Sequence, residues 1–315
     1  MQKIAEFIRN NDNFILIPHK NPDGDCLGSV TALLFGIREL GKTAYISLPT
    51  EPSERLSYLW DESMRTPDGF IPDACITVDV AALYMIDCLK DSVFDKAPHT
   101  ACIDHHGTNK GFADVNYIDS SAAACGEIVF ELLKDYLNVS MTKPVCESLY
   151  SAISSDTGCF RYSNTTRKTH LIAAELIDKG IDSAKIIRDL FETKKLESLK
   201  ISVDLIQNME FFFDGRVCII SADNELLDKY NMNFDMIEEY ASLPRSVEGV
   251  EVGAFLKIKS DNEVKISLRS NEYVDVSLVA SALGGGGHKR ASGITVNGDA
   301  QKAKELLLNE LKNHF

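Results

Sequence analysis

The stretch FILIPHKNPDGD, residues 14–25, decides the fold of the N-terminal half of the chain. Its first five residues form a short apolar run typical of a buried strand, and apolar spacing predicts a helix over residues 28–40. His19, Asp23 and Asp25 lie in the polar turn between them. Ligands of open α/β sheets bind beyond the carboxyl ends of the strands, so these side chains stand where a ligand is expected. Asp and Gly are also common in plain turns, and this stretch alone leaves both interpretations open.

Short apolar runs and longer amphipathic stretches alternate through the first half of the chain. Further strands are predicted over residues 44–48, 74–78 and 100–103. Further helices are predicted over residues 122–136 behind an N-cap at Ser121, over 145–154 and over 168–179. This alternation predicts an α/β fold with a mostly parallel sheet flanked by helices.

The second half of the chain predicts a smaller α/β domain. Residues 186–211 have apolar positions at helical spacing, so we expect a connecting helix or helix pair there. The elements predicted after it are a strand over 216–222, a hairpin of 251–259 and 263–269, a helix over 274–283, a glycine loop over 284–287, a strand over 294–296 and a terminal helix from Asp299. We therefore expect an N-terminal domain over 1–185, a helical linker over 186–211 and a C-terminal domain over 212–315.

The composition excludes several classes of protein. The 315 residues are 44% hydrophobic and 25% charged, which is typical of a globular chain and excludes a disordered or fibrous one. No apolar run reaches the roughly 18 residues of a membrane span, and the N-terminal stretch lacks the apolar segment of a secretory signal. We therefore expect no membrane partner and a cytoplasmic location. None of the 8 cysteines falls in a CxxC pair, which favours free thiols over disulfides.

The net charge limits the kind of nucleic acid that the chain can bind. It is −14, from 33 Lys and Arg against 47 Asp and Glu. Binding along duplex DNA needs clustered cationic side chains, so the charge argues against long duplex DNA as a partner. A small phosphorylated ligand stays compatible, because bound divalent cations would reverse the field around an acidic site.

Two further strand ends carry acidic residues and histidines. Asp79 comes directly after the third predicted strand. Asp104, His105 and His106 end the fourth, and Asp156 follows a predicted helix. Since the carboxyl ends of parallel strands meet at one edge of a sheet, we expect these side chains to converge on the turn after the first strand. Their joint occurrence by chance is improbable.

In order and rough spacing, these motifs resemble the DHH phosphoesterase superfamily over nearly the whole chain. The matching N-terminal motifs are His19 with Asp23 and Asp25, then Asp79, then Asp104-His105-His106, then Asp156. The tail, Gly284 to His288 with Ala291 to Gly293, is similar to the glycine-rich signature of the DHH-associated C-terminal domain. Within the superfamily, length and tail most resemble the branch of nanoRNases and pAp phosphatases. The resemblance implies a metal-binding catalytic domain followed by a substrate-binding domain.

The ligand types predict a metal site. Four Asp and two His, with no thiolate among them, suit Mn²⁺ or Mg²⁺, and the imidazoles favour Mn²⁺. The resemblance implies two ions, with His19 and Asp23 on one, Asp25, His105 and Asp156 on the other, and Asp79 bridging them. Ions about 3.5 to 4 Å apart can activate a shared water for in-line attack on phosphorus.

Two more residues of these motifs are implied to act in catalysis. Asp104 would accept the second ring N–H of a ligating histidine and so fix the orientation of its ring. His106 would face the phosphate. A partly buried, hydrogen-bonded His106 without that role stays an alternative.

The C-terminal glycine run predicts a substrate contact, because glycine lets backbone N–H groups approach a phosphate or base closely. An arginine at the end of the predicted hairpin could add a bidentate phosphate contact. The candidate substrate-binding residues are Arg161, Arg269, Gly285, Gly286, Gly287, His288 and Arg290. Alternatively, the glycines are a mobile linker and Arg161 is a surface residue.

The resemblance implies a metal-dependent phosphoesterase. Its expected reactions are hydrolysis of short single-stranded oligoribonucleotides to 5′-mononucleotides and conversion of pAp to AMP. One alternative is a phosphodiesterase for cyclic or linear dinucleotides. Another is a catalytically silent nucleotide-binding regulatory protein, which the complete set of six ligands argues against. A homodimer is possible.

Overall fold

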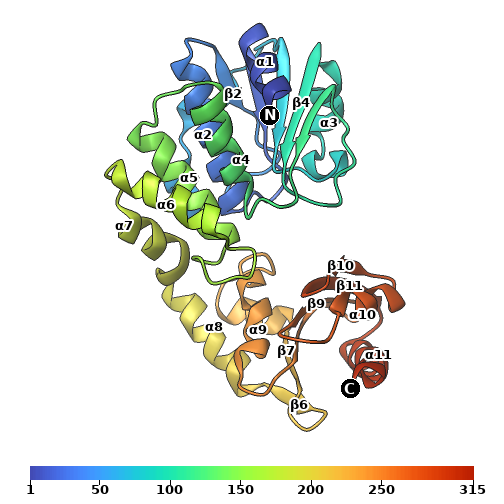
Figure 1. Ribbon diagram of the computed structural model, residues 1–315. Helices are drawn as coiled ribbons and strands as arrows, with labels where there is room; N and C mark the ends of the chain where they lie inside the picture. The colour runs from blue at the N-terminus through green and yellow to red at the C-terminus, as the bar shows by residue number, and fades with distance from the viewer. The chain divides into compact units, whose positions relative to one another are not determined.

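The computed structural model describes residues 1–315 and divides into two compact units, Met1–Thr193 and Lys194–Phe315. Each unit has its own sheet with helices packed against it (Figure 1). The buried residues of the hydrophobic clusters in one unit are all distinct from those in the other. The division between the units falls inside segment 186–211, whose role as a linker stays a prediction.

The first unit contains a five-stranded sheet in which every pairing is parallel, as predicted. The strands, in the sheet order β2-β1-β3-β4-β5, are Ala44–Ile46, Phe14–Ile17, Ala74–Val78, His99–Asp104 and Val115–Ile118. Side chains along β1 alternate between two cores: Phe14 and Leu16 pack on one face, Ile15 and Ile17 on the other. The sheet is therefore buried on both faces, which explains its unbroken apolar runs.

Helices cover both faces of this sheet (Figure 1). The α-helices are α1 Gln2–Asn10, α2 Gly24–Glu39, α3 Leu89–Ser92, α4 Cys125–Glu131, α5 Lys143–Asp156, α6 Arg167–Asp178 and α7 Ser183–Ile187. Short 3₁₀ turns are Glu54–Leu59, Glu62–Met64, Leu83–Ile86 and Phe94–Lys96, and π-helical turns are Leu132–Tyr136 and Arg188–Glu192. No helix in either unit is long and apolar enough to cross a membrane.

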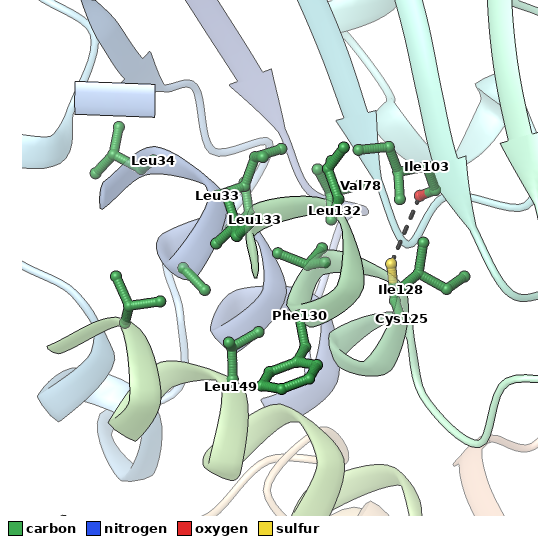
Figure 2. Close-up of a cluster of buried hydrophobic side chains, with 14 of the residues drawn as sticks. Leu33, Leu34, Val78, Ile103, Cys125, Ile128, Phe130, Leu132, Leu133 and Leu149 are labelled. Atoms are coloured by element: carbon green, nitrogen blue, oxygen red, sulfur yellow. Dashed lines mark hydrogen bonds between the residues drawn. The ribbon is translucent and has the colours of Figure 1, made fainter. Parts of the chain in front are cut away.

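The largest core lies where α2, α4 and α5 pack together and against the sheet. Figure 2 shows Leu33 of α2, Phe130 of α4 and Leu149 of α5 in this cluster. The Sγ atom of Cys125 donates to the carbonyl oxygen of Ile103 at 3.6 Å and so connects α4 to β4. All 8 cysteines are free thiols, as predicted.

Two predicted helix starts in this unit are wrong. Helix α2 begins at Gly24 rather than at residue 28, because the Asp23 carboxylate accepts the backbone N–H of Cys26 at 3.0 Å and caps the helix. Helix α4 begins at Cys125. Ser121 does not cap it, because both its N–H and its hydroxyl donate to the side chain of Asp119.

The second unit contains a six-stranded mixed sheet in which only β7 and β8 pair in parallel. In the sheet order β10-β11-β9-β8-β7-β6, its strands are Gly286–His288, Ala291–Asn297, Glu263–Ser270, Val252–Ser260, Val217–Ala222 and Glu210–Phe212. Its helices are α8 Leu196–Gln207, α9 Asn224–Lys229, α10 Val276–Ala282 and α11 Ala300–Leu311, with 3₁₀ turns Glu238–Ser242, Pro244–Ser246 and Lys312–His314. Helices α10 and α11 pack on one face of the sheet, and α8 and α9 on the other.

The predicted hairpin is confirmed as β8 and β9. The predicted glycine loop is wrong for Gly286 and Gly287, while Gly284 and Gly285 lie outside helices and strands. Residues 286–288 form the edge strand β10, which pairs antiparallel with β11. The two backbones lie so close that a Cβ atom on Gly285 would stand 2.2 Å from the carbonyl oxygen of Gly293. Glycine is therefore required here for a close backbone approach, which a loop prediction from flexibility does not capture.

Candidate metal centre

The acidic residues and histidines of the sequence motifs converge at the carboxyl end of the first sheet. His19, Asp79 and His105 each lie just past the end of a strand, while Asp25 lies in the first turn of α2 and Asp156 is the last residue of α5. The potential ligand atoms form three overlapping groups, each within 4.8 Å: His19, Cys26 and Asp79; Asp79, His105 and His106; and Asp25, His105 and Asp156. Asp79 and His105 each belong to two groups, so the groups form one continuous cluster.

The distances in this cluster exceed those of hydrogen bonds. The His19 Nε2 atom is 3.8 Å from Asp79 Oδ2, and His105 Nε2 is 3.5 Å from Asp79 Oδ1, 3.6 Å from Asp156 Oδ2 and 3.8 Å from Asp25 Oδ2. Two atoms that each lie about 2.1 Å from one cation are themselves roughly 3 Å or more apart. The side chains are therefore spaced as they would be around metal ions, and the cluster could hold one.

Asp79 is the most constrained member of the cluster. It is only 2% exposed, its Oδ1 atom has no hydrogen-bond partner, and its φ of 59° lies in the left-handed region. Burial, reinforced by the neighbouring carboxylates of Asp25, Asp23 and Asp156, raises the pKa of Asp79 well above its usual value. A buried carboxylate oxygen without a partner is costly, and a cation beside it would relieve both the missing contact and the repulsion.

Asp25 serves the fold as well as the cluster. Its Oδ2 atom accepts the N–H of Cys125 at 2.7 Å, and Oδ1 accepts the N–H of Gly126 and the hydroxyl of Ser29, both at 3.0 Å. Helix α4 has no side-chain cap of its own, so Asp25 caps it from α2. Burial raises the pKa of Asp25 to about 6, against the opposing effect of His105.

Asp156 adds a further carboxyl group that is hard to ionise. Burial, followed by the charge of Asp25, raises the pKa of Asp156 to about 7. The buried carboxyls of the cluster cannot all carry a charge near neutral pH unless positive charge is present beside them. This donor set of carboxylates and imidazoles suits divalent metal ions.

The two imidazole rings that face the carboxylates are held by backbone carbonyls. The Nδ1 atom of His105 lies 3.3 Å from the carbonyl oxygen of Ala122, and Nδ1 of His19 lies 2.8 Å from that of Lys20. A carbonyl oxygen only accepts, so Nδ1 carries the proton in each ring. In the neutral ring, each Nε2 atom is then left with a lone pair toward the carboxylates, which is the arrangement of a metal-binding histidine.

His106 has a different environment. Its Nδ1 atom is 2.7 Å from Asp104 Oδ1. Asp104 also accepts the backbone N–H of His105 at 2.9 Å and the side-chain amide of Asn109 at 2.8 Å. The hydrogen bond to Asp104 raises the pKa of His106. Burial acts to raise the pKa of Asp104, but the hydrogen bonds from His106 and Asn109 outweigh it and lower the pKa. Asp104 therefore orients the ring of His106. The sequence analysis instead predicted that Asp104 orients the ring of a ligating histidine, but the ring of His105 is held by the carbonyl of Ala122.

Asp23 stands apart from the three groups of ligand atoms. One of its oxygens is used in capping α2, and its charge acts on Asp25 and Asp79. Cys26, which the sequence analysis did not assign, stands in the group with His19. Its Sγ atom accepts the N–H of His19 at 3.3 Å and donates to a strand carbonyl at 3.5 Å.

Sequence reasoning also missed Ser29 and Asn109. Ser29 follows Asp25 by four residues, which on a helix places the two side chains on one face. That spacing was a usable signal once α2 was known to include Asp25. Asn109 lies outside helices and strands, and no local pattern predicts its contact with Asp104.

The candidate substrate-binding arginines all contact the backbone near them. Arg161 is exposed and donates to the carbonyl oxygen of Gly158 at 2.6 Å, and Arg269 donates to that of Leu268 at 3.0 Å. Arg290 donates to the carbonyl oxygens of Glu272 and Val274 and to the hydroxyl of Ser270. Gly285, Gly286, Gly287 and His288 are exposed at the edge of the second sheet.

Comparisons with known proteins cover both units. Residues 13–153 match the DHH family, N-terminal domain, and residues 215–314 match the DHHA1 domain. A bifunctional oligoribonuclease and PAP phosphatase NrnA from Thermus thermophilus is 31% identical, over 100% of this chain and 94% of the relative. A protein named as the probable equivalent from Streptococcus mutans is 30% identical over 97% of this chain and 96% of its own.

A solved structure shows that the fold of the whole chain is similar to that of a known protein. An exopolyphosphatase-related protein from Bacteroides fragilis superposes with a TM-score of 0.90 and 25% identity, covering 99% of this chain and 95% of its own. With family matches in both units and a relative 31% identical along the full chain, the protein belongs to the DHH family.

Proposed function

We propose that the protein is a metal-dependent hydrolase of phosphoester bonds that cleaves short oligoribonucleotides to 5′-mononucleotides and converts pAp to AMP. The observation that carries this proposal is the cluster of carboxylates and imidazoles around the unpaired oxygen of Asp79. The full-length similarity to two proteins named for these same two activities supports the choice of substrates.

We propose two divalent cations, Mn²⁺ before Mg²⁺, with His19 and Asp23 on one, Asp25, His105 and Asp156 on the other, and Asp79 bridging them. Support comes from the two oxygens of Asp79: Oδ2 faces His19, and Oδ1 faces His105. A carboxylate whose oxygens face two different imidazoles is suited to bridging. When bound, such a pair of cations lowers the pKa of a shared water and neutralises charge on the attacking and leaving oxygens.

His106 is proposed to bind the phosphate. Its Nδ1 proton is held by Asp104, and the raised pKa of His106 favours the doubly protonated ring. In that form the ring carries positive charge and has a second N–H at Nε2, which can donate to a phosphate oxygen. Asp104 is then a positioning residue, since it acts through His106.

We propose that the edge of the second sheet binds the substrate through Gly285, Gly286, Gly287, His288, Arg269 and Arg290. Arg161 stays a separate candidate for substrate binding. Because β10 is an edge strand, one side of it has no neighbouring strand. The exposed His288 can reach a ligand without breaking any other contact named above. Arg290 would first have to release the carbonyls that it binds, so His288 has the stronger support.

An assay of a labelled RNA trinucleotide and of pAp with Mn²⁺ tests the proposal. We expect turnover of both, and loss of both activities when Asp79 is replaced by Asn. The matched control is Asp299→Asn, which changes an exposed helix cap in the other unit. Absence of turnover on both substrates would contradict the proposal. Faster hydrolysis of a cyclic dinucleotide would favour the alternative substrate class, and nucleotide binding without hydrolysis would favour a regulatory protein.

A further inference from the structure

The orientation of His105 depends on a loop. The Nδ1 atom of this ring is hydrogen-bonded to the carbonyl oxygen of Ala122, at 3.3 Å. Ala122 lies in the irregular segment between β5 and α4, where no ladder of backbone hydrogen bonds fixes the chain. A loop carbonyl can fix the ring only if something else fixes the loop.

Two side chains form hydrogen bonds with the backbone of Ala123, the next residue of this loop. The side-chain amide of Asn164 donates to the carbonyl oxygen of Ala123 at 2.9 Å. The Glu127 carboxylate accepts the N–H of Ala123 at 3.3 Å. Ala123 is 1% exposed, so water does not compete for these contacts. Glu127 therefore holds the peptide group that carries the acceptor of His105, and Asn164 holds the following peptide group.

Asn164 also contacts the backbone of another candidate ligand. The same amide nitrogen donates to the carbonyl oxygen of Asp156, at 3.1 Å. One side chain thus connects the loop that orients His105 to the residue whose carboxylate lies 3.6 Å from the His105 ring. Since both partners are carbonyl oxygens, only the NH₂ group of Asn164 can face them.

The position of this amide has a cost to the fold. The Oδ1 atom of Asn164 and the Oε1 atom of Glu127 are both buried without a hydrogen-bond partner. Unpaired buried polar atoms destabilise a protein, and those of native structures call for an explanation. For Asn164 and Glu127, the explanation is that both side chains hold the loop at Ala123.

We infer that Asn164 is a positioning residue of the metal centre, which sets the ring orientation of His105 through the loop at Ala122 and Ala123. This inference rests on the proposed function, because it assigns a role toward the same centre. With Asn164 removed, the loop keeps its contact with Glu127 but loses the one at the carbonyl of Ala123, so the carbonyl of Ala122 is held less firmly as the acceptor that keeps the proton of His105 on Nδ1. The ring then exposes its lone pair at Nε2 for only part of the time.

The test is the tautomer of the neutral His105 ring in the metal-free protein, read by NMR of protein labelled with ¹⁵N-histidine. The chain has 7 histidines, and a His105→Ala variant assigns the signal. We expect the Nδ1-protonated form in the wild type and a mixture of both tautomers in Asn164→Ala. Asn164→Asp is the second variant: it keeps the size of the side chain and replaces the donor by an acceptor.

Asn271→Ala is the matched control. The Asn271 amide also donates to two backbone carbonyls, those of Arg245 at 2.9 Å and Val250 at 2.8 Å, but it belongs to the second unit. We expect this variant to lose stability without any change in the His105 signal. An unchanged tautomer of His105 in a folded Asn164 variant would overturn the inference.

Mn²⁺ titration followed by EPR gives a second readout that does not need catalysis. Loss of a residue that supports a metal ligand typically weakens metal binding by about 10- to 100-fold. We expect this loss at one of two sites in Asn164→Ala and at neither in Asn271→Ala. If the wild type hydrolyses no substrate while the tautomer changes, the proposed function fails and the positioning role stands. If the wild type is active and the tautomer is unchanged, only the positioning role fails.

Discussion

Asp79 combines three features that an ordinary structural carboxylate avoids: burial, a left-handed backbone and an oxygen without a partner. Each costs free energy of folding. Neighbouring carboxylates of Asp25 and Asp156 add repulsion. The metal-free protein therefore carries strain in its folded state at this residue.

Asp79→Asn is expected to stabilise the metal-free protein while removing its metal binding. The amide replaces a buried carboxyl group that must either carry a charge or take up a proton, so we expect the free energy of unfolding without metal to rise by about 1–3 kcal/mol. Turnover with Mn²⁺ should fall at least about 100-fold, since the carboxylate that we propose to bridge the two cations is gone. Denaturant titration and the trinucleotide assay measure the two effects. A variant that is less stable than wild type without metal would contradict the assigned strain.

The pKa values of Asp25 and Asp156 predict how stability depends on pH. They are raised from 3.8 to about 6 and about 7, so the folded protein binds more protons than the unfolded chain between these limits. Stability of the metal-free protein should therefore fall as pH rises from about 4 to 7. Thermal unfolding with EDTA at pH 5 and pH 8 measures this loss.

Metal addition should reverse that trend. Since Mn²⁺ competes with protons for the carboxylates, its stabilisation of the protein should be larger at pH 8 than at pH 5. Replacing both Asp25 and Asp156 by Asn is the control. It should reduce the pH dependence without metal, and the raised pKa values of Asp79 and His106 account for what remains. A metal-free protein that is more stable at pH 8 than at pH 5 would refute the raised pKa values.

Among the elements, α2 and α5 determine the geometry of the centre, because they carry Asp25 and Asp156. They pack closely at Gly28: a Cβ atom there would lie 2.5 Å from the backbone carbonyl oxygen of Ser148. Backbone atoms cannot move aside as the end of a flexible side chain can. The spacing of the two helices, and with it that of the two carboxylates, depends on this glycine.

Gly28→Ala is expected to destabilise the protein by about 1–3 kcal/mol, through overpacking between α2 and α5. Gly36→Ala on the same helix is the matched control, since its Cβ atom would meet only the flexible end of Leu133. We expect a smaller loss there and normal metal binding, whereas Gly28→Ala should also weaken Mn²⁺ affinity. Thermal unfolding and Mn²⁺ titration compare the two. Equal effects of both substitutions would contradict this account of the packing.

At the edge of the second sheet, the glycines are not equivalent. A Cβ atom on Gly287 would lie 2.6 Å from the carbonyl oxygen of Ala291, whereas one on Gly286 would meet nothing within 4 Å. We expect Gly287→Ala to open the pairing of β10 with β11, and Gly286→Ala to preserve it. Limited proteolysis and hydrogen exchange of residues 286–297 measure the difference. Protection of β10 in Gly287→Ala equal to that in the wild type would contradict it.

The elements also explain which predictions from the sequence succeed. Buried apolar runs made β1, β3 and β4 recognisable, and their order gave the parallel sheet. β5 was missed because residues 115–118 are mostly half-buried at the sheet edge and lack an unbroken apolar pattern. The start of α4 was misplaced because its cap comes from Asp25, about a hundred residues earlier in the chain.

For the candidate centre, residue types and their order along the chain predicted the convergence of His19, Asp25, Asp79, His105 and Asp156, but they did not predict that Asp23 stands apart or that Cys26 joins the group. They could not predict which atoms face each other. The pairing of Asp104 with His106, and the carbonyl partner of His105, depend on loop conformations that no periodic pattern encodes. Asn109 and Asn164 act through such loops and were absent from the predicted site.

The whole molecule combines two separately packed units with a net charge of −14. Strong overall negative charge repels a long polyanion, while a short substrate meets mainly the local field of the bound cations. Formation of a homodimer stays a prediction. Sedimentation velocity tests it by measuring the mass of the protein in solution.

Substrate length should therefore govern the reaction. We expect kcat/KM for an RNA trinucleotide to exceed that for a 24-nucleotide RNA by about tenfold or more at low salt, since repulsion acts over the Debye length. Added salt should narrow the difference by screening the repulsion. Steady-state assays at about 50 and 200 mM salt compare the two. Equal values for both lengths would show that overall charge does not select the substrate.

Asp25 limits the ways in which a descendant of this protein could lose its activity. The carboxyl that faces His105 also caps α4, so we expect a mutation at this position to harm folding together with the proposed metal binding. In the contacts described above, the side chains of His19 and Asp156 do not cap a helix. In related proteins that keep this fold but no longer hydrolyse phosphoesters, we expect His19 and Asp156 to be replaced first and Asp25 to be retained.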